Sequence, residues 1–592
     1  MVNSLNEKQL LAFMTVKKAF DTTTRGTTLR STATSSTTTT ITTTGSANGS
    51  NDKHGSQLLM FLSGQGGTGK SHLIRAVSLL AYITYGRTEG LWGPIRLCAP
   101  TGNSAYNIGG STWQSALGKS VTEKALKNNT PMAAAGVQRL VHKALGCKCF
   151  VLDEISLLSS QETFEVHKRL CYATGVHDKP FGGLHVIFSG DFYQLKCFKG
   201  APIPSTLSHP TNVNNAESRM GREIWEQFNS FIELTENCRA RETNGVLSQL
   251  AAFNSAARLC DFSDPRTLLT INSRVRNNLD SIIKVADTKA IYMTDTHNKI
   301  GDINDVYQQR AESRNTPIHR LVADHVPSKL TMLYPDQHTR NILYGTKGDI
   351  KGAATTLMLS HIDLYVGCRV RCTRNLSTEL GIYNGRMGTV MGFVYQQPTI
   401  TDADRKQLNR MKFSIMTAVQ REIPIVLVQL DAPSSGGSGD DKKEKKKKEK
   451  NNGISISAKT PWLIPFSPID SMEQLIIGTN KYIRRQIPLL PAAARSIHSV
   501  QGLTAHNGAI IDPKNGFYAG TYVAISRATS LDNVYLTQPA TANDFSHDSE
   551  FRQTVGLEYK RLRKLFPQTT IVAATSADTT TSSSSSSTSS SS

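Results

Sequence analysis

The residues with the clearest chemical potential form one glycine-rich run, Gly64-Gln65-Gly66-Gly67-Thr68-Gly69-Lys70-Ser71. The run follows a short apolar stretch at 58–62 and precedes a segment of helical periodicity, so we expect a strand, a loop and a helix. In that setting glycine N–H groups wrap phosphates, and the helix N-terminus adds partial positive charge. Lys70 would reach the β- and γ-phosphates, and the Ser71 hydroxyl would bind Mg²⁺. The run therefore predicts a nucleoside-triphosphate site.

Two adjacent carboxylates, Asp153 and Glu154, follow the apolar run 149–152. Ligands of parallel sheets bind at the carboxyl ends of the strands. We expect Asp153 to hold Mg²⁺, directly or through water, and Glu154 to orient and deprotonate the attacking water. An isolated Asp-Glu pair is more often a solvated strand end. Its position after a phosphate loop, at domain-scale spacing, favours the functional interpretation.

The elements that must position these groups are short apolar runs followed by helical segments, at 58–62, 95–98, 149–152, 185–188 and 508–511. Near-continuous apolar strands that alternate with helices predict a parallel sheet covered on both faces, an α/β fold. Residues 364–396 differ, because they are rich in β-branched residues and glycine-containing turns. They predict a small antiparallel unit, with Asn384-Gly385 as a hairpin turn.

Length and charge narrow the class of protein. A chain of 592 residues exceeds what one hydrophobic core supports, and its net charge of +20 favours a polyanionic partner, nucleic acid before a membrane surface. The nine scattered cysteines suggest neither a disulfide framework nor a zinc site. No apolar run is long enough to span a bilayer, and the amino terminus lacks the layout of a secretory signal, so we expect an intracellular protein without a membrane partner.

Low-complexity segments interrupt the chain. A Lys/Glu run at 442–450 lies inside a Gly/Ser-rich stretch and is interpreted first as a solvated loop, with a nuclear-localisation or DNA-contacting patch as the alternative. On that weak signal we expect the nucleus, with the mitochondrion as the other compartment. Residues 551–566 place apolar side chains on one helical face and basic ones on the rest, which predicts a docking helix; a membrane-surface or partner-binding helix is the alternative.

A set of segments, in order along the chain, resembles the petite-integration-frequency (Pif) family of superfamily-one DNA helicases, relatives of the RecD-type enzymes. Beside the phosphate loop and Asp153-Glu154-Ile155-Ser156, the segments that carry this resemblance are Leu5-Asn6-Glu7-Lys8-Gln9, Ala99-Pro100-Thr101-Gly102, Asn107-Ile108-Gly109-Gly110, Gly190-Asp191-Phe192-Tyr193-Gln194-Leu195, Leu234-Thr235-Glu236-Asn237-Cys238-Arg239, Ser496-Ile497-His498-Ser499-Val500-Gln501-Gly502-Leu503-Thr504 and Tyr522-Val523-Ala524-Ile525-Ser526-Arg527-Ala528.

The resemblance implies a role for each matching residue. Gln9 would recognise adenine, Gln194 would sense the γ-phosphate, and Arg239 and Arg527 would be arginine fingers contributed by a second motor domain. The residues implied to bind ATP are Gln9, Gly64, Gly66, Gly67, Thr68, Gly69, Lys70 and Ser71, with Ser71 and Asp153 on the metal. The residues implied to contact single-stranded DNA are Thr101, Asn107, His498, Gln501 and Thr504.

The family's architecture is two RecA-like P-loop motor domains with a small SH3-like β insertion in the second. Mapped onto this chain, it predicts an adenine-recognition element at 1–20, a disordered Thr/Ser-rich insertion at 21–55, a first motor domain at 56–235, a second motor domain at 236–363 and 483–568 that ends in a basic helix, an SH3-like insertion at 364–482 with a disordered stretch at 434–453, and a disordered Ser-rich tail at 569–592.

The resulting expectation is a 5′-to-3′ DNA helicase that uses ATP and Mg²⁺ and acts as a monomer on single-stranded, forked or tailed DNA, in repair, recombination, replication or telomere maintenance. The chain departs from the family pattern at Lys196-Cys197, where two prolines are usual. Two alternatives stay open: a transposon-derived nucleic-acid-binding protein without activity, and a P-loop ATPase that remodels RNA or protein.

Overall fold

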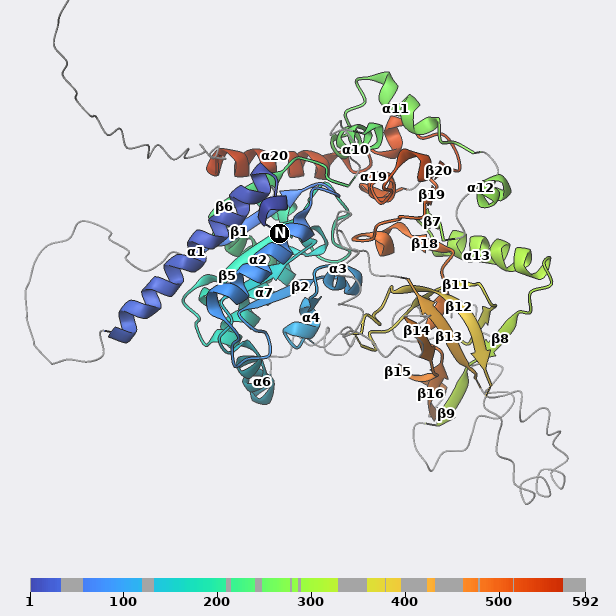
Figure 1. Cartoon of the computed structure of the whole chain (residues 1–592), viewed down its shortest axis with the longest axis horizontal. Helices are drawn as coiled ribbons and strands as arrows, with labels where there is room; N and C mark the ends of the chain where they lie inside the picture. Colours follow the sequence, from blue (N-terminus) through green and yellow to red (C-terminus); the bar gives the residue numbers. More distant parts are fainter. Residues whose placement is uncertain are drawn as a thin grey trace, which may run out of the picture.

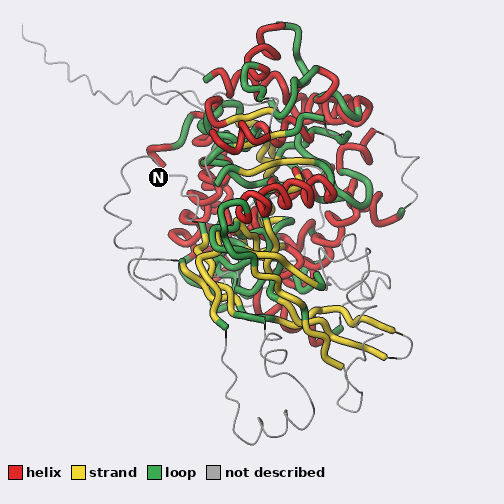
Figure 2. The backbone as a smooth tube through the Cα atoms, turned by 90° about the vertical axis from the view of Figure 1, so that its right-hand side faces the viewer, coloured by secondary structure: helices red, strands yellow, loops and turns green. Residues whose placement is uncertain are grey.

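The computed structural model describes residues 2–32, 57–119, 133–208, 215–239, 248–276, 279–285, 289–327, 359–377, 380–395, 423–431, 462–477, 480–514 and 516–567. Within these residues the elements form two parallel sheets with helices around them and one strand-rich insertion (Figure 1). Figure 2 shows the strands of the insertion gathered at one end of the molecule. The α/β class with two motor-type sheets is therefore confirmed.

The first sheet has six parallel strands in the order β3-β2-β4-β5-β1-β6. Its central strands are almost wholly buried, which explains why they appear in the sequence as continuous apolar runs. The strands are β1 (Leu59–Gly64), β2 (Ile95–Ala99), β3 (Ser111–Thr112), β4 (Cys149–Leu152), β5 (His185–Gly190) and β6 (Ser230–Leu234).

Helices cover both faces of this sheet, and each face has its own hydrophobic core. α7 begins at a capping box in which Ser159 and Glu162 exchange hydrogen bonds with each other's backbone. The helices of this part are α1 (Glu7–Thr32), α2 (Lys70–Tyr85), α3 (Gly102–Asn107), α4 (Trp113–Ala116), α6 (Ala134–Ala144), α7 (Ser160–Thr174), α8 (Ile203–Ser208) and α9 (Ala216–Glu226), with short 3-10 helices at Val2–Ser4, Ile155–Leu157 and Pro180–Gly183.

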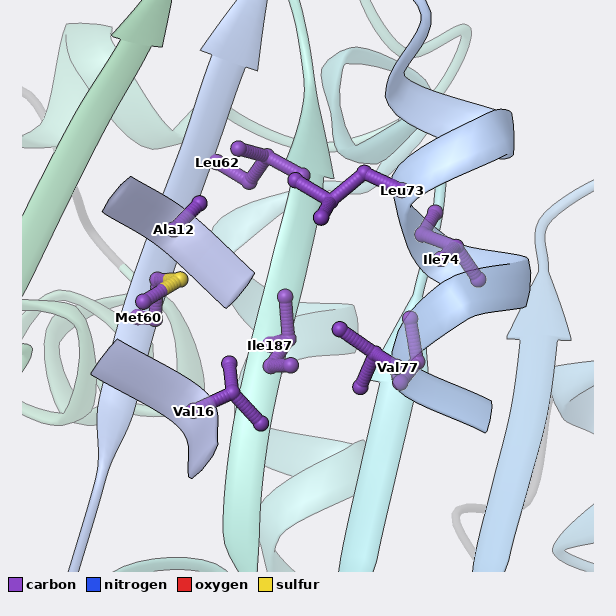
Figure 3. Close-up of a pocket in the computed structure, with 9 residues that line it drawn as sticks. Ala12, Val16, Met60, Leu62, Leu73, Ile74, Val77 and Ile187 are labelled. Atoms are coloured by element: carbon purple, nitrogen blue, oxygen red, sulfur yellow. The ribbon is translucent and has the colours of Figure 1, made fainter. Parts of the chain in front are cut away.

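α1 and α2 pack side by side on one face of the sheet, over β1 and β5 (Figure 3). Ala12 and Val16 of α1 meet Leu73 and Val77 of α2 above the strands. The void left between them encloses about 10 Å³ and is lined only by apolar side chains. A space that small and without polar partners holds no ordered water, so the contact is a dry core.

The predicted disorder at 21–55 is wrong for its first part, because α1 continues to Thr32. Phe20 is fully buried against Tyr85 and His185, and it holds the helix on the sheet. The hydroxyls of Thr23 and Thr24 donate to carbonyls one turn earlier, which satisfies them inside the helix. Residues 33–56, as well as the low-complexity stretches 434–453 and 569–592, lie outside the described residues.

The second sheet has four parallel strands in the order β18-β7-β19-β20. Its strands come from distant parts of the chain: β7 (Ile291–Thr294), β18 (Ala494–Ser496), β19 (Ala509–Ile511) and β20 (Val534–Leu536). Around it lie α10 (Gln249–Leu259), α11 (Pro265–Asn272), α12 (Leu279–Val285), α13 (His297–Glu312) and α19 (Gly520–Ile525), with 3-10 helices at Ile497–Val500, Leu531–Asn533 and Ala542–Asp544.

The insertion in this second domain is wider than the predicted 364–482. It begins with strands near 319 and ends near 491, because Leu321, Ile362 and Leu489 join its hydrophobic core. The main antiparallel sheet runs β14-β13-β12-β11-β17, beside smaller sheets β15-β16-β9 and β10-β8. The strands are β8 (His319–Val322), β9 (Asp324–Pro327), β10 (His361–Leu364), β11 (Arg369–Cys372), β12 (Met387–Val394), β13 (Ile425–Leu430), β14 (Leu463–Phe466), β15 (Ile469–Ile477), β16 (Asn480–Gln486) and β17 (Leu489–Pro491).

Asn384-Gly385 forms a turn, although it does not join two strands directly. Arg386 N donates to Tyr383 O, and Gly385 has φ +97° whereas Asn384 keeps a negative φ. This is a type II turn, in which only the third residue needs the left-handed region. A connection of residues 373–386 separates β11 from β12, so the predicted two-residue hairpin is wrong.

The last helix, α20 (Ser549–Leu565), lies across both halves of the molecule (Figure 1). Its apolar face is buried as the periodicity predicts: Phe551, Val555, Tyr559 and Leu562 all join the main core. Glu558 accepts a hydrogen bond from Trp225 Nε1 of the first domain, while Phe551 packs on Tyr518 of the second. The search of the described helices finds none of the length and hydropathy that a membrane crossing requires.

Candidate functional site

The glycine-rich run forms the loop between β1 and α2, as its sequence predicts. Gly67 and Gly69 have φ of +95° and +81°, so side chains there would be strained. Lys70 opens α2 and its ammonium donates to the carbonyls of Gly64 and Gln65, turning the charge into the loop. Burial lowers the pKa of Lys70, against the raising effect of the Glu154, Asp153 and Asp191 carboxylates. The loop therefore presents one buried cation to a phosphate.

Asp153 follows β4 at the edge of the sheet that holds the phosphate loop. Burial and the neighbouring Glu154 raise the pKa of Asp153 to about 6, although Lys70 opposes them. Its Oδ1 is buried and accepts no hydrogen bond within the described part of the chain. An oxygen in that condition suits Mg²⁺, which usually takes one or two protein oxygens beside phosphates and water. With the Ser71 hydroxyl on α2, the donor set fits the metal.

Glu154 has an unusual backbone. Its φ of 54° and ψ of 45° lie in the left-handed region, which non-glycine residues adopt at a cost of about 1–3 kcal/mol. The next peptide passes close to β5: a Cβ on Gly190 would lie 2.9 Å from Ile155 N. The left-handed bend thus turns the chain away from the sheet directly after Asp153. The Glu154 side chain stays buried beside the loop, where a carboxylate can act on a water molecule.

Two arginines from the other side of the molecule lie over the phosphate loop. A Cβ on Gly66 would be 3.3 Å from Arg527 Nη2 and 3.7 Å from Arg239 Nη1. Arg239 also donates to the carbonyl of Ser526, which links the two segments. Burial and the adjacent Arg527 lower the pKa of Arg239 to about 10. Two buried guanidiniums that repel each other above a glycine loop form a site for a multiply charged anion.

Gln194 and Asp191 follow β5, and both are fully buried. Gln194 Oε1 has no hydrogen-bond partner among the described residues. Asp191 accepts bonds from Arg258 at 2.9–3.2 Å; burial alone would raise the pKa of Asp191, but this guanidinium keeps it below its usual range. Arg258 lies on α10, so this buried pair joins the first domain to the second. No sequence motif marked Arg258, because a single arginine on a helix carries no spacing signal.

Gln9 lies against the phosphate loop. Its Nε2 donates to Thr68 O at 3.0 Å, and its Oε1 accepts from Asn6 N. Gly69 must lack a side chain, since a Cβ there would be 2.3 Å from Gln9 Nε2. The structure thus places Gln9 at the loop as expected, and its role toward adenine stays a prediction.

Asn237 was not singled out as a functional residue, although it lies in the segment that carries Arg239. Its Oδ1 would be 2.7 Å from a Cβ on Gly67, and Cys238 N donates to Gly67 O at 2.8 Å. The connection that leaves β6 therefore runs along the phosphate loop and fixes the position of Arg239. The signal was available in the adjacency of Asn237 to the arginine.

The residues expected to contact DNA separate into two groups. Thr101 caps α3, Asn107 ends it and donates to Gly502 O, and Thr504 is partly exposed close by in sequence. His498 lies between the rings of Phe198 and Phe517, at 4.6 and 4.5 Å. Gln501 differs, because its side chain is 2% exposed and donates to Glu154 Oε2 and Ser156 Oγ. As a surface contact to DNA, Gln501 is wrong: burial turns it toward the nucleotide site.

Comparisons with known proteins follow this geometry. The sequence profile of the PIF1-like helicase family matches residues 46–259. An ATP-dependent DNA helicase Pif1 of Psychrobacter sp. (strain PRwf-1) is 25% identical over 494 residues, which cover 81% of this chain and 65% of that protein. The chain therefore spans slightly less than two thirds of that relative's length.

Solved structures show the same fold. The crystal structure of Pif1 helicase from Candida albicans superposes with a TM-score of 0.54 at 20% identity, covering 85% of this chain and 96% of that one. Bacteroides Pif1 bound to ssDNA gives a TM-score of 0.52 at 18% identity, covering 86% and 94%. The agreement extends well beyond the residues that the family profile matches, into the second sheet and the insertion.

Proposed function

The chain belongs to the PIF1-like helicase family, and on that premise we propose that it is an ATP-dependent DNA helicase. One observation carries the proposal: Lys70, Asp153 and Glu154 of the first domain and Arg239 and Arg527 of the second meet at one phosphate loop. An ATP site shared by two domains changes shape when the nucleotide changes. That is what a motor needs to convert hydrolysis into movement.

In the proposed reaction, the loop N–H groups and Lys70 bind the β- and γ-phosphates, and Glu154 accepts a proton from the attacking water. Arg239 and Arg527 stabilise the charge that develops on the transferred phosphoryl group. Ser71 and Asp153 would hold Mg²⁺, which neutralises phosphate charge. Gln194 would report the state of the γ-phosphate, since it is buried between this site and the Asp191–Arg258 pair that joins the domains.

Single-stranded DNA is the proposed track. Bacteroides Pif1 has been solved with ssDNA, and the net charge of +20 suits a phosphate backbone. Thr101, Asn107, His498 and Thr504 lie on α3 and on the loop that meets it, so they are the proposed contacts. We propose 5′-to-3′ movement from the family resemblance, action as a monomer, and a nuclear location.

An ATPase assay with single-stranded DNA, with single-stranded RNA and without nucleic acid tests the proposal. A DNA helicase hydrolyses ATP faster with DNA than with RNA. A binding protein without activity hydrolyses nothing under any condition, and an ATPase that remodels RNA does not respond to DNA. Either result would overturn the assignment.

Strand displacement on duplexes with a 5′ or a 3′ single-stranded tail tests the polarity. We expect unwinding only from the 5′ tail, and unwinding from the 3′ tail alone would contradict it. The dependence of the unwinding rate on protein concentration tests the monomer, which predicts a first-order rise without cooperativity.

A further inference from the structure

Gln501 occupies a position that the proposed mechanism does not yet use. It follows the 3-10 helix Ile497–Val500 in the second domain, yet its side chain reaches into the first. Its Nε2 lies 3.3 Å from Glu154 Oε2 and 3.2 Å from Ser156 Oγ. Its Oε1 is buried and has no partner among the described residues. The amide is therefore committed through its nitrogen to the group that would activate water.

The backbone of the same residue is held by the other face of the molecule. Asn103 Nδ2 donates to Gln501 O at 3.4 Å, and Asn107 Nδ2 donates to Gly502 O at 2.5 Å. Both asparagines lie on α3. A Cβ on Gly502 would lie 2.5 Å from Ser104 Oγ of the same helix, so no side chain fits there. The 496–504 loop is thus clasped to α3 by its backbone and to Glu154 by one side chain.

The contact with Glu154 has a direct chemical consequence. A general base must offer a free oxygen lone pair to the water that it deprotonates. An N–H donated to Oε2 occupies one lone-pair site and holds the carboxylate in one orientation. At 3.3 Å the bond is longer than typical N–H···O bonds, so it can be broken at little cost.

We propose that Gln501 restrains Glu154 until single-stranded DNA engages the 496–504 loop and α3, so that binding of the track frees the base for hydrolysis. This inference rests on the proposed function, because it assumes that DNA stimulates the ATPase. Gln501 is a positioning residue here, since it acts on the reaction through Glu154. Because DNA and Gln501 act on the same loop, ATP turnover without a track is suppressed.

The test uses the full chain and three variants. Q501M keeps the length and volume of the side chain but removes the donor, and Q501N retracts the amide by one carbon–carbon bond while keeping the site polar. Q538M is the matched control, because Gln538 Nε2 also donates to a carboxylate, Asp512 Oδ1, at 2.8 Å, away from the phosphate loop. Steady-state ATPase is measured without DNA and with saturating oligo-dT, and DNA affinity by fluorescence anisotropy.

We expect Q501M and Q501N to raise the DNA-free kcat by about three- to tenfold, the effect of one hydrogen bond to a charged group. The kcat at saturating DNA and the affinity for oligo-dT should stay within about twofold, and Q538M should match wild type throughout. A merely structural role would lower both rates, so a rise in the DNA-free rate is specific to the restraint.

Other outcomes decide against it. If wild type is stimulated by oligo-dT but the DNA-free kcat of both Gln501 variants is unchanged or lower, the restraint is wrong and the proposed function survives. If affinity for oligo-dT falls about tenfold at an unchanged DNA-free rate, Gln501 acts on the track instead. If wild type hydrolyses no ATP, or ignores DNA, the proposed function fails and the restraint fails with it.

Discussion

Lys70 and Glu154 show how much chemistry rests on single buried charges. The ammonium lies among three carboxylates, those of Glu154, Asp153 and Asp191, which offset the burial that lowers its pKa. The left-handed backbone of Glu154 holds its carboxylate in the same pocket. Each residue thus has one task that no neighbour among the described residues duplicates: charge toward the phosphates for Lys70, and proton acceptance for Glu154.

Replacing these two residues separates binding from turnover. We expect Lys70→Ala to abolish DNA-stimulated ATPase and to weaken ATP binding, because the loop loses its cation. Glu154→Gln should bind ATP as wild type does while kcat falls by about 10²–10⁴, the usual contribution of a general base. Nucleotide binding is measured with a fluorescent ATP analogue and turnover by phosphate release. Full turnover in either variant would exclude the assigned roles.

The sequence was sufficient at residues whose chemistry depends on local spacing. The phosphate loop and Asp153-Glu154 are read directly, because strand, loop and helix follow one another in the chain. Arg258 and Tyr559 were beyond reach as site residues, since their partner Asp191 is far away in sequence and no local pattern encodes the contact. Gln501 was recognised in its motif but assigned to the wrong surface, because a motif does not show which way a side chain turns.

At the scale of elements, two helical glycines have opposite roles. Gly221 of α9 packs against α7 so closely that a Cβ would lie 1.8 Å from Ser160 O, whereas a Cβ on Gly301 of α13 would meet nothing within 4 Å. Gly221→Ala should therefore lower the apparent Tm of the first domain, by about 1–3 kcal/mol of local stability. Gly301→Ala should leave stability unchanged or raise it by up to about 1 kcal/mol. Differential scanning calorimetry of both variants measures the contrast, and equal shifts would refute it.

His185 makes the attachment of α1 sensitive to pH. Its Nδ1 accepts from Leu58 N and its Nε2 bonds the Thr23 hydroxyl, and burial lowers the pKa of His185 to about 4. The unfolded chain therefore binds a proton below pH 6.5 that the folded chain refuses until about pH 4. Stability should fall as pH drops through that interval, by at most about 1.4 kcal/mol per pH unit.

Thermal unfolding between pH 7.5 and pH 4.5 tests the histidine. His185→Gln keeps a hydrogen-bonding amide but cannot titrate, so its apparent Tm should vary less with pH than that of wild type. Identical pH profiles for the two proteins would show that His185 does not contribute.

The insertion illustrates why the boundaries of elements are harder to predict than their type. The β-branched run at 369–394 identified β11 and β12, yet β8, β10 and β17 lie outside the predicted bounds. These strands are short, and their apolar residues have meaning only once Leu321, Ile362 and Leu489 meet in one core. Pairing between distant strands is set by the fold, and no local period reveals it.

At the scale of the whole molecule, Tyr559 of α20 connects parts that are far apart in sequence. It is fully buried, its hydroxyl lies 2.8 Å from Ser63 Oγ and 3.3 Å from both Asp191 Oδ1 and Phe192 N, and its ring stacks on Tyr193. Tyr559→Phe keeps the ring and removes the hydroxyl. We expect an apparent loss of about 1–3 kcal/mol in stability, because buried polar partners are left unsatisfied.

Tyr535→Phe is the matched control for this change. The ring of Tyr535 is buried in the second sheet's core, and its hydroxyl makes no hydrogen bond within the described ranges. Its apparent Tm should stay close to wild type, and a loss equal to that of Tyr559→Phe would show that the hydrogen bonds of α20 are not responsible.

The course of the chain into α20 limits how the two sheets can move. The backbone leaves the first domain after β6 and, after building the second, returns to it through α20, whose Glu558 and Arg563 bind Trp225 and Glu233. Two bodies joined by a single flexible link can turn about three axes. Joined at two separate points they retain one, the line through both points, as a door retains one between its two hinges. Each nucleotide cycle then opens and closes the molecule along the same arc, and repeated small strokes add up in one direction.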